Sequence, residues 1–160
     1  MQTAKDIRET MDLKRRYDAL VQRNLAGIYR TSLDGTLLEA NDALAHILGY
    51  RDAAELMTLP VARLYRSVEE REHFLAQLLE HKRLVNFELT LRHRTGRDVN
   101  VLENVFLDED GDGPMAIQGS LIDITSFKVA EIEQRALMAS YRSLVEHIRD
   151  GLLVVVDGRI

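Results

Sequence analysis

The stretch that decides the fold is residues 86–107, NFELTLRHRTGRDVNVLENVFL. Apolar and polar side chains alternate on both sides of the dipeptide Thr95-Gly96, which is typical of a turn. The apolar positions are Phe87, Leu89 and Leu91 before the turn and Val99, Val101 and Val105 after it. A period of two is that of a strand with one buried face. We therefore predict an antiparallel hairpin here.

Three further strands are predicted outside this hairpin. Residues 27–40, GIYRTSLDGTLLEA, hold two β-prone runs around Asp34-Gly35, a dipeptide that strongly favours a hairpin turn. After an acidic loop, residues 115–124 form another apolar run of strand length. The sequence thus predicts five strands.

Helices are predicted at residues 5–24, 42–48, 67–82 and 126–148. Asn41 is a good N-cap for the second of these, and Gly49 is a good C-terminal stop. The resulting order is helix, two strands, helices, three strands and helix. This order predicts an α+β domain built on an antiparallel sheet.

One segment of the sequence occurs twice. Residues 17–27, YDALVQRNLAG, return as residues 141–151, YRSLVEHIRDG, and an apolar run with an Asp-Gly pair follows each copy. Self-similarity of this kind indicates that one structural unit begins twice. We therefore predict residues 152–156, LLVVV, as the first strand of a second, truncated copy.

Composition excludes several classes of function. The chain of 160 residues has a net charge of −5 and no cysteine. The negative charge disfavours nucleic acid as a partner, because its binding depends on clustered Lys and Arg. The lack of cysteine excludes disulfides, a thiolate nucleophile and cysteine-based metal sites. No segment approaches the ~20 apolar residues of a membrane span and no signal-peptide core is present, so we expect a cytoplasmic location.

The sequence resembles the PAS family of sensor domains over roughly residues 17–130. The resemblance begins with residues 39–50, EANDALAHILGY, which are similar to the segment after the first hairpin of these domains. It continues at Glu88, Thr95-Gly96, Gly119 and the closing triplet Asp123-Ile124-Thr125, which a helix follows. That triplet is the most specific of these features.

The resemblance implies a fold and a role. It implies a five-stranded antiparallel sheet with helices on one face and a small cavity between them. It also implies a signal-sensing or relay module of a multidomain bacterial-type signalling protein. The output domain in the same chain would be a histidine kinase of a two-component system or a cyclic-dinucleotide enzyme, and a small molecule is a candidate ligand.

The resemblance also implies how the chain is divided. The divisions are an N-terminal helix at residues 1–24, a PAS domain at 25–125, a helical linker at 126–148 and the start of a second PAS domain at 149–160. The candidates for lining the cavity are Ile47, Leu64, Phe74, Leu78, Phe87 and Leu89.

The sequence identifies no cofactor. The light-sensing flavin subclass of PAS domains forms its adduct on a cysteine, which this chain lacks. Haem-binding relatives place an axial histidine on the long helix, where this chain has His73 and His81. The ligand position aligns near Arg71 instead, and the charges around His73 predict a solvated surface. The pattern therefore disfavours haem.

An acidic loop resembles part of a calcium site. Asp108, Asp110, Asp112 and Gly113 match the first half of the calcium-loop pattern. The twelfth position, where a glutamate would complete the ligand shell, is Gly119, and strands rather than helices flank the loop. We predict a solvated loop and no metal site.

No catalytic motif is present. The sequence lacks a G-x-S-x-G elbow, a phosphate-binding glycine loop and an H-E-x-x-H helix. His147 lies in a segment that faintly resembles the phospho-accepting helix of sensor kinases, but the repeat aligns it with Arg23 on an ordinary helix. We expect no catalytic residue and no enzymatic activity.

Two helices carry apolar stripes of the kind that pair with other helices. The stripes are Leu13, Tyr17 and Leu20 in the N-terminal helix and Leu137, Tyr141, Leu144 and Ile148 in the linker. Steps of three and four are those of a helical seam, so we expect a homodimer through both helices. The alternative is that the linker stripe packs on its own domain.

The joint between the last strand and the linker is the candidate site of signal transmission. Asp123 and Thr125 place a carboxylate and a hydroxyl at a helix N-terminus, where both are stabilising.

Three interpretations of the function follow from the sequence. The chain is a sensory module, a ligand-free dimerisation module with a filled core, or, as the weakest alternative, an enzyme.

Overall fold

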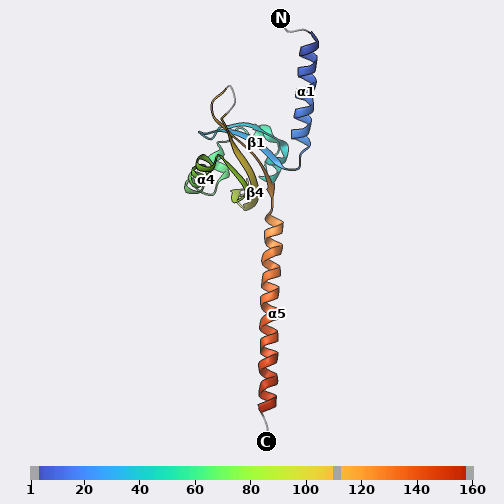
Figure 1. Ribbon diagram of the computed structural model, residues 1–160, viewed down its shortest axis with the longest axis vertical. Coiled ribbons are helices and arrows are strands. Elements are labelled where there is room, and N and C mark those ends of the chain that lie inside the picture. The colour runs from blue at the N-terminus through green and yellow to red at the C-terminus, as the bar shows by residue number, and fades with distance from the viewer. Residues whose placement is uncertain (1–3, 110–112, 158–160) are drawn as a thin grey trace. The chain divides into compact units, whose positions relative to one another are not determined.

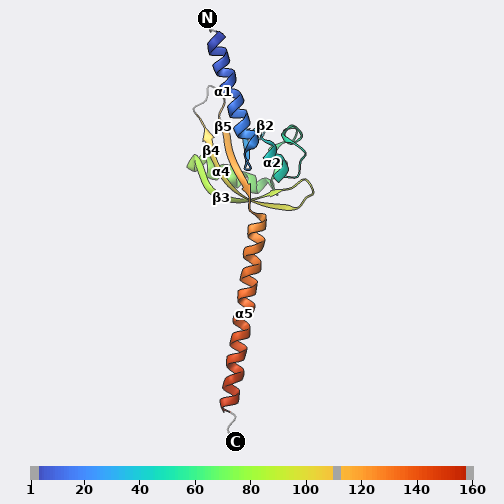
Figure 2. The same cartoon turned by 90° about the vertical axis from the view of Figure 1, so that its right-hand side faces the viewer.

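The computed structural model describes residues 4–109 and 113–157. Its central element is an antiparallel sheet (Figures 1 and 2). Its five strands, within those residues, are β1 (Gly27–Ser32), β2 (Leu37–Ala40), β3 (Arg83–Arg92), β4 (Asp98–Asp108) and β5 (Ala116–Asp123). They lie in the order β2-β1-β5-β4-β3, so the last strand of the sequence occupies the middle of the sheet. The predicted α+β class and the five-stranded antiparallel sheet are confirmed.

Helices accompany this sheet, and three of them lie at the predicted residues 5–24, 42–48 and 67–82. The helices are α1 (Ala4–Arg23), α2 (Asp42–Ile47), α3 (Ala53–Leu56), the 3-10 helix η1 (Val61–Leu64) and α4 (Val68–His81). In the described part of the chain, none of the helices combines the length and the apolar character that crossing a membrane requires.

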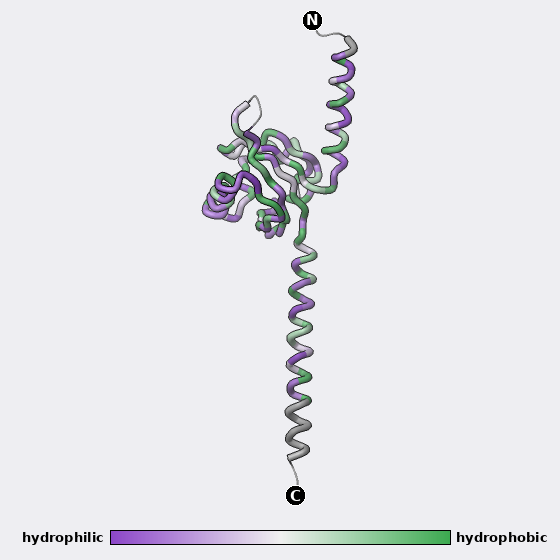
Figure 3. Tube along the Cα trace, in the orientation of Figure 1, coloured by the Kyte–Doolittle hydropathy of each residue, from purple (hydrophilic) through white to green (hydrophobic). Residues whose placement is uncertain are grey.

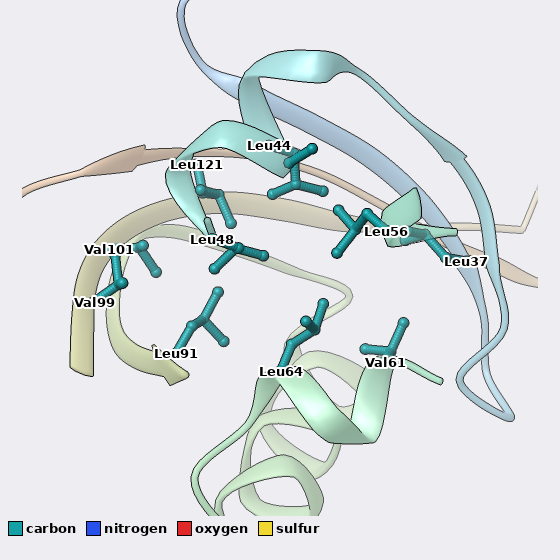
Figure 4. Packing of buried hydrophobic residues seen from close by; sticks show 11 residues of the cluster. Leu37, Leu44, Leu48, Leu56, Val61, Leu64, Leu91, Val99, Val101 and Leu121 are labelled. Carbon is teal, nitrogen blue, oxygen red and sulfur yellow. The ribbon is translucent and has the colours of Figure 1, made fainter. Parts of the chain in front are cut away.

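The hydrophobic core lies between the sheet and these helices. Figure 4 shows side chains from α2, α3 and η1 pointing toward those of β3, β4 and β5. Leu48, Leu56, Val99 and Val101 are completely buried in this cluster. A second cluster around Phe74, Leu78 and Val105 joins α4 to the other end of the sheet. Large-to-small changes in such a core cost about 2–5 kcal/mol each.

Asn41 connects three elements through one buried side chain. Its Oδ1 accepts hydrogen bonds from the N–H groups of Ile28 at 2.9 Å and of Leu44 at 3.0 Å. Its Nδ2 donates to the carbonyls of Val21 and Ala26, each at 2.9 Å. The carboxamide thus uses an acceptor and both donors to hold the end of α1, the start of β1 and the first turn of α2.

Residues 125–157 form a separate compact unit, the helix α5 (Thr125–Asp157). Hydrophobic and hydrophilic residues alternate along the part of α5 that is coloured in Figure 3. Its stripe of Leu137, Tyr141, Leu144 and Ile148 is more than 60% exposed at each position.

The prediction of a strand at residues 152–156 is wrong, because α5 continues to Asp157. A strand must pair with a neighbouring strand, whereas a helix satisfies most backbone groups within one segment. The described part of the unit that begins at Thr125 holds no strand with which this segment could pair. Gly158 of the predicted turn lies outside the described residues, and the second domain copy stays a prediction.

Candidate functional site

The candidate site is a small cavity between the sheet and the helices α2, η1 and α4. Its volume is about 40 Å³, and most of the side chains that line it are aliphatic. Four titratable or charged side chains also line it: Tyr29, Tyr65, Arg71 and Glu103. A largely apolar lining with a few polar groups is usual for a small-molecule site.

Glu103 is the most unusual of these residues, because its carboxyl group is buried. It lies on β4 in phase with Val101 and Val105, so the strand alternation turns it toward the core. Only 2% of the residue is exposed. Its Oε1 accepts a hydrogen bond from the hydroxyl of Tyr29, while its Oε2 has no hydrogen-bond partner among the described residues.

Gly119 makes the contact between Tyr29 and Glu103 geometrically feasible. Tyr29 on β1 is opposite Gly119 on β5, and Gly119 is opposite Val105 on β4. The tyrosine ring therefore lies over the glycine and reaches across β5 to the glutamate. A Cβ atom at position 119 would lie 2.5 Å from the tyrosine oxygen, which is far too close.

Replacing Gly119 with alanine is expected to destabilise the domain by about 2 kcal/mol, since the new methyl group overpacks the space that Tyr29 occupies. Urea unfolding measures this loss. Gly113→Ala is the matched control, because a Cβ atom there meets no atom of the described residues within 4 Å. Equal stability of the two variants would contradict the steric role of Gly119.

Burial controls the ionisation of the site. It raises the pKa of Glu103 to about 7 from an ordinary value of 4.5, although the hydrogen bond from Tyr29 acts in the opposite direction. Burial, and next the charge of Glu103, raise the pKa of Tyr29 well above its usual value. The pKa of Tyr65 is raised by the same two causes, with Arg71 opposing them. Glu103 is therefore the group in this cavity that changes charge near neutral pH.

An aromatic row borders the cavity on the side of α4. The ring centroids of Tyr65 and Phe74 are 6.0 Å apart, and those of Phe74 and Phe87 are 5.8 Å apart. The guanidinium carbon of Arg71 lies 5.7 Å from the centroid of the Tyr65 ring, within the range of a cation–π interaction. Beyond the row, a surface groove of about 390 Å³ runs between α4 and β3.

The structure separates the six predicted lining residues into three groups. Leu64, Phe74 and Leu89 line the cavity. Phe87 lines the surface groove instead. Ile47 packs against the first core cluster and Leu78 belongs to the second, and neither lines the cavity.

The sequence analysis missed the polar part of the site. Tyr29, Tyr65, Arg71 and Glu103 were not among its candidates for lining the cavity. One signal was available for Glu103, because residues 99, 101, 103 and 105 share one face of a strand and three of them are valine. A charged residue in phase with a buried apolar stripe indicates a buried site.

The histidines considered as haem ligands lie away from the cavity. His73 and His81 are exposed, and Nδ1 of His81 is 2.9 Å from the carbonyl of Gln77. Residues 110–112 of the predicted acidic loop lie outside the described residues. At its edge, Asp108 forms an ion pair with Arg30 at 3.1 Å. Within the described residues, no three His, Asp or Glu side chains are grouped so that they could hold a metal ion.

Comparison with known protein families gives a match to the PAS domain over residues 25–126. The chain belongs to the PAS domain family. No curated protein sequence matched the chain.

Solved structures with the same fold include PAS domains from several organisms. A domain of a sensory box sensor histidine kinase/response regulator from Geobacter sulfurreducens is 26% identical, with a TM-score of 0.56, and the match covers 69% of this chain and 94% of that one. The PAS domain of an HTR-like protein from Haloarcula marismortui is 20% identical, with a TM-score of 0.62 and coverage of 76% and 100%. The PAS domain of a LuxR-family transcriptional regulator from Burkholderia thailandensis, in complex with ethanol, is 17% identical, with a TM-score of 0.58 and coverage of 68% and 97%.

Proposed function

We propose that this PAS domain is a sensory module that relays a change in its cavity to α5, within a multidomain signalling protein. The observation that carries the proposal is the buried pair of Glu103 and Tyr29, which bridges β4 and β1 across β5. In a region of low polarity, the hydrogen bonding and charge of a partly hydrogen-bonded carboxyl group depend strongly on any other group that enters the cavity. The pair is therefore suited to detecting a ligand in the cavity.

The strand β5 is the proposed path of the signal. Ile117 and Leu121 of this strand line the cavity, and β5 ends at Asp123, immediately before the joint with α5. The N–H group of Ile124 donates to the carbonyl of Asn100 at 2.8 Å, which extends the pairing with β4. A shift of the cavity-lining side chains thus acts on the joint that contains Asp123 and Thr125.

The comparisons support a signalling context and a small ligand. The Geobacter sulfurreducens domain belongs to a sensor histidine kinase/response regulator, and the Burkholderia thailandensis domain holds ethanol. By this likeness we propose a kinase-type output domain in the same chain and a small molecule in the cavity. We propose a cytoplasmic location and no catalytic role for the domain itself.

Homodimerisation through the helices is part of the proposal. The stripe on α5 is exposed, and Leu13, Tyr17 and Leu20 on α1 are 50–74% exposed. Exposed apolar seams of this spacing are covered when two helices pair. When two copies pair, a change at the joint alters the packing of the two α5 helices against each other. This change in packing is the proposed output of the relay.

A cysteine at Leu144 is expected to cross-link two copies of the chain, because paired seams bring equivalent positions within the short distance that a disulfide requires. The chain has no cysteine, so a single introduced thiol reports this contact alone. Glu146→Cys, two residues away and off the stripe, is the matched control. Non-reducing gels at micromolar concentration measure the yield. Equal yields for Leu144→Cys and Glu146→Cys would refute the seam.

The relay itself is tested in the Leu144→Cys background. Glu103→Gln changes the cavity and should change the cross-linking rate, whereas Asp123→Ala should uncouple the joint. In the Asp123→Ala protein, the added Glu103→Gln change should have no further effect, which is the non-additivity expected of coupled sites. Independent effects of the two changes would show that the joint is only structural.

A ligand-free dimerisation module is the second candidate, favoured by the small cavity volume of about 40 Å³. Native mass spectrometry of the dimer separates the two candidates. A dimer without a bound small molecule, whose cross-linking rate is unchanged by Glu103→Gln, would favour the structural role.

A further inference from the structure

Arg71 is a charged side chain on the wall of the cavity, and its guanidinium group is held by one long contact. The residue lies on α4 and lines the cavity together with Glu103. One guanidinium nitrogen donates to the carbonyl of Leu33 at 3.4 Å, which is longer than an ordinary hydrogen bond. The same nitrogen lies 2.7 Å from the place that a Cβ atom of Gly35 would take. Arg71 thus rests against the turn between β1 and β2.

Arg71 interacts with charges on both sides of this turn. Outside, the hydrogen bonds of exposed Asp34, chiefly that from Ser32, lower the pKa of its carboxyl group, and the charge of Arg71 acts in the same direction. Inside, burial raises the pKa of Tyr65, the charge of Glu103 raises it further, and Arg71 opposes both. The guanidinium group of Arg71 and the carboxyl group of Glu103 therefore both act on the hydroxyl of Tyr65.

The ionisation of Glu103 decides which of the two carboxyl groups attracts Arg71 more strongly. With Glu103 neutral, Asp34 carries the one negative charge of the two, so the guanidinium group stays at the turn. When Glu103 loses its proton, the buried charge has Tyr29 as a donor to Oε1, while no described residue donates to Oε2. A buried charge without a counter-charge is costly, and a guanidinium group supplies both the charge and the donor.

We propose that Glu103 and Arg71 form a proton-operated switch, in which loss of the proton from Glu103 draws the guanidinium group of Arg71 from the turn into the cavity, where it donates to Oε2. This inference rests on the proposed sensory function and deepens it, because it names the proton as the signal. Tyr29 already connects Glu103 on β4 to β1. In the ionised state, Arg71 adds α4 to this connection and leaves the turn between β1 and β2.

The other groups that face Glu103 keep one charge state in the neutral range. In the described lining, titratable or charged side chains besides Glu103 come from β1 (Tyr29), the residue after η1 (Tyr65) and α4 (Arg71), whereas α2, β2, β3, β5 and η1 contribute apolar ones. Burial, and next the charge of Glu103, raise the pKa of both tyrosines, so they stay neutral. Arg71 stays charged, and Asp34 stays ionised because its pKa is lowered.

An NMR titration of the whole chain from pH 5 to pH 8.5 tests the switch at two places. The side-chain carboxyl carbon of Glu103 reports its ionisation, and the backbone amide of Gly35 reports the departure of Arg71 from the turn. Burial raises the pKa of Glu103 to about 7, and pairing with Arg71 favours the ionised form. Both signals should therefore change with one midpoint, at or somewhat below pH 7.

Glu103→Gln is the control for this titration, because the five histidines of the chain also titrate near neutral pH. The variant keeps every histidine but has no proton to lose at position 103. The Gly35 amide should lose its titration in this variant. A Gly35 signal that titrates alike in the variant and the parent protein, or that does not follow Glu103 in the parent, would overturn the proposal.

Variants of Arg71 test the ion pair itself. Arg71→Gln should raise the midpoint of Glu103 by about one pH unit, since a nearby opposite charge lowers the pKa of a carboxyl group by at least that amount. Arg71→Lys keeps the charge and should restore most of the difference. Arg63→Gln is the matched control, because it removes an exposed charge on η1 outside the cavity lining and should leave the midpoint unchanged. Equal midpoints in Arg71→Gln and the parent protein would refute the inward movement.

The relay is measured separately, through cross-linking of the Leu144→Cys protein. Its rate is divided by that of the same protein with Glu103→Gln at the same pH, which removes the pH dependence of the thiol. We expect a ratio near one at pH 6 and a departure from one at pH 8. A constant ratio beside an intact titration would support the switch and refute the relay. A ratio that departs equally at both pH values, without titration of Glu103, would support the relay and refute the proton as its signal.

Discussion

Replacing Asn41 with alanine is expected to lower the free energy of unfolding by about 3 kcal/mol. Asn41 is completely buried, and its side chain makes hydrogen bonds to four backbone groups. Loss of the N-cap alone costs about 1 kcal/mol, and the other backbone groups left without partners add to that cost. Urea unfolding followed by circular dichroism measures the change.

Asp52→Ala is the matched control for this prediction. Asp52 is the N-cap of α3 and accepts a hydrogen bond from the N–H group of Glu55 at 2.8 Å. It should therefore lose about 1 kcal/mol, the value of a single cap, because its ion pair with Arg51 is exposed and contributes little. If the two alanine variants were equally stable, Asn41 would be an ordinary cap and not the connection between three elements.

Replacing Glu103 with glutamine is expected to stabilise the domain at pH 8 by up to about 3 kcal/mol. The wild-type carboxyl group must ionise at this pH in a buried place, which lowers the stability of the folded state. Glutamine keeps the shape and the acceptor for Tyr29 but carries no charge. Urea unfolding at pH 8 and pH 5 measures the difference.

The direction of the pH dependence follows from the raised pKa of Glu103, about 7 in the folded protein against an ordinary value of 4.5. Between these two values the folded state binds more protons than the unfolded state, so stability falls as the pH rises. The contribution of the neutral carboxyl group is complete below about pH 4.5 and is lost by about pH 7. The Glu103→Gln variant should lack this fall, and its advantage should disappear at low pH.

Glu39→Gln is the control for charge alone. Glu39 is exposed on β2, and the substitution changes the net charge by the same amount. We expect its stability to follow that of the wild type at both pH values. A Glu103→Gln variant that did the same would show that Glu103 is not buried in solution as it is in the structure.

Periodicity was sufficient to predict the sheet but not its strand order. Alternation in residues 86–107 and the Asp34-Gly35 turn identify both hairpins, because these patterns are local. The position of β5 between β1 and β4 depends on pairings between residues about 90 positions apart, such as Tyr29 with Gly119. Such pairings follow from the packing of the whole domain, which local patterns do not contain.

The site was harder to predict because its parts are separated in the sequence. Tyr29 and Glu103 are 74 residues apart, and they meet only because position 119 carries no side chain. The sequence analysis noted Gly119 as a family feature, without the contact that it permits. Apolar candidates such as Leu64 and Leu89 could be named from their elements, whereas the polar pair required the tertiary structure.

The central position of β5 has a consequence for how the protein is made. A growing chain that has not yet reached residue 116 contains the two hairpins but not the strand that joins them. Until then β1 and β4 each present an unpaired edge, the kind of surface on which unfinished chains aggregate. The sheet becomes a single unit only when its last strand leaves the ribosome. A chain that ends before residue 116 therefore lacks the strand that pairs with both β1 and β4.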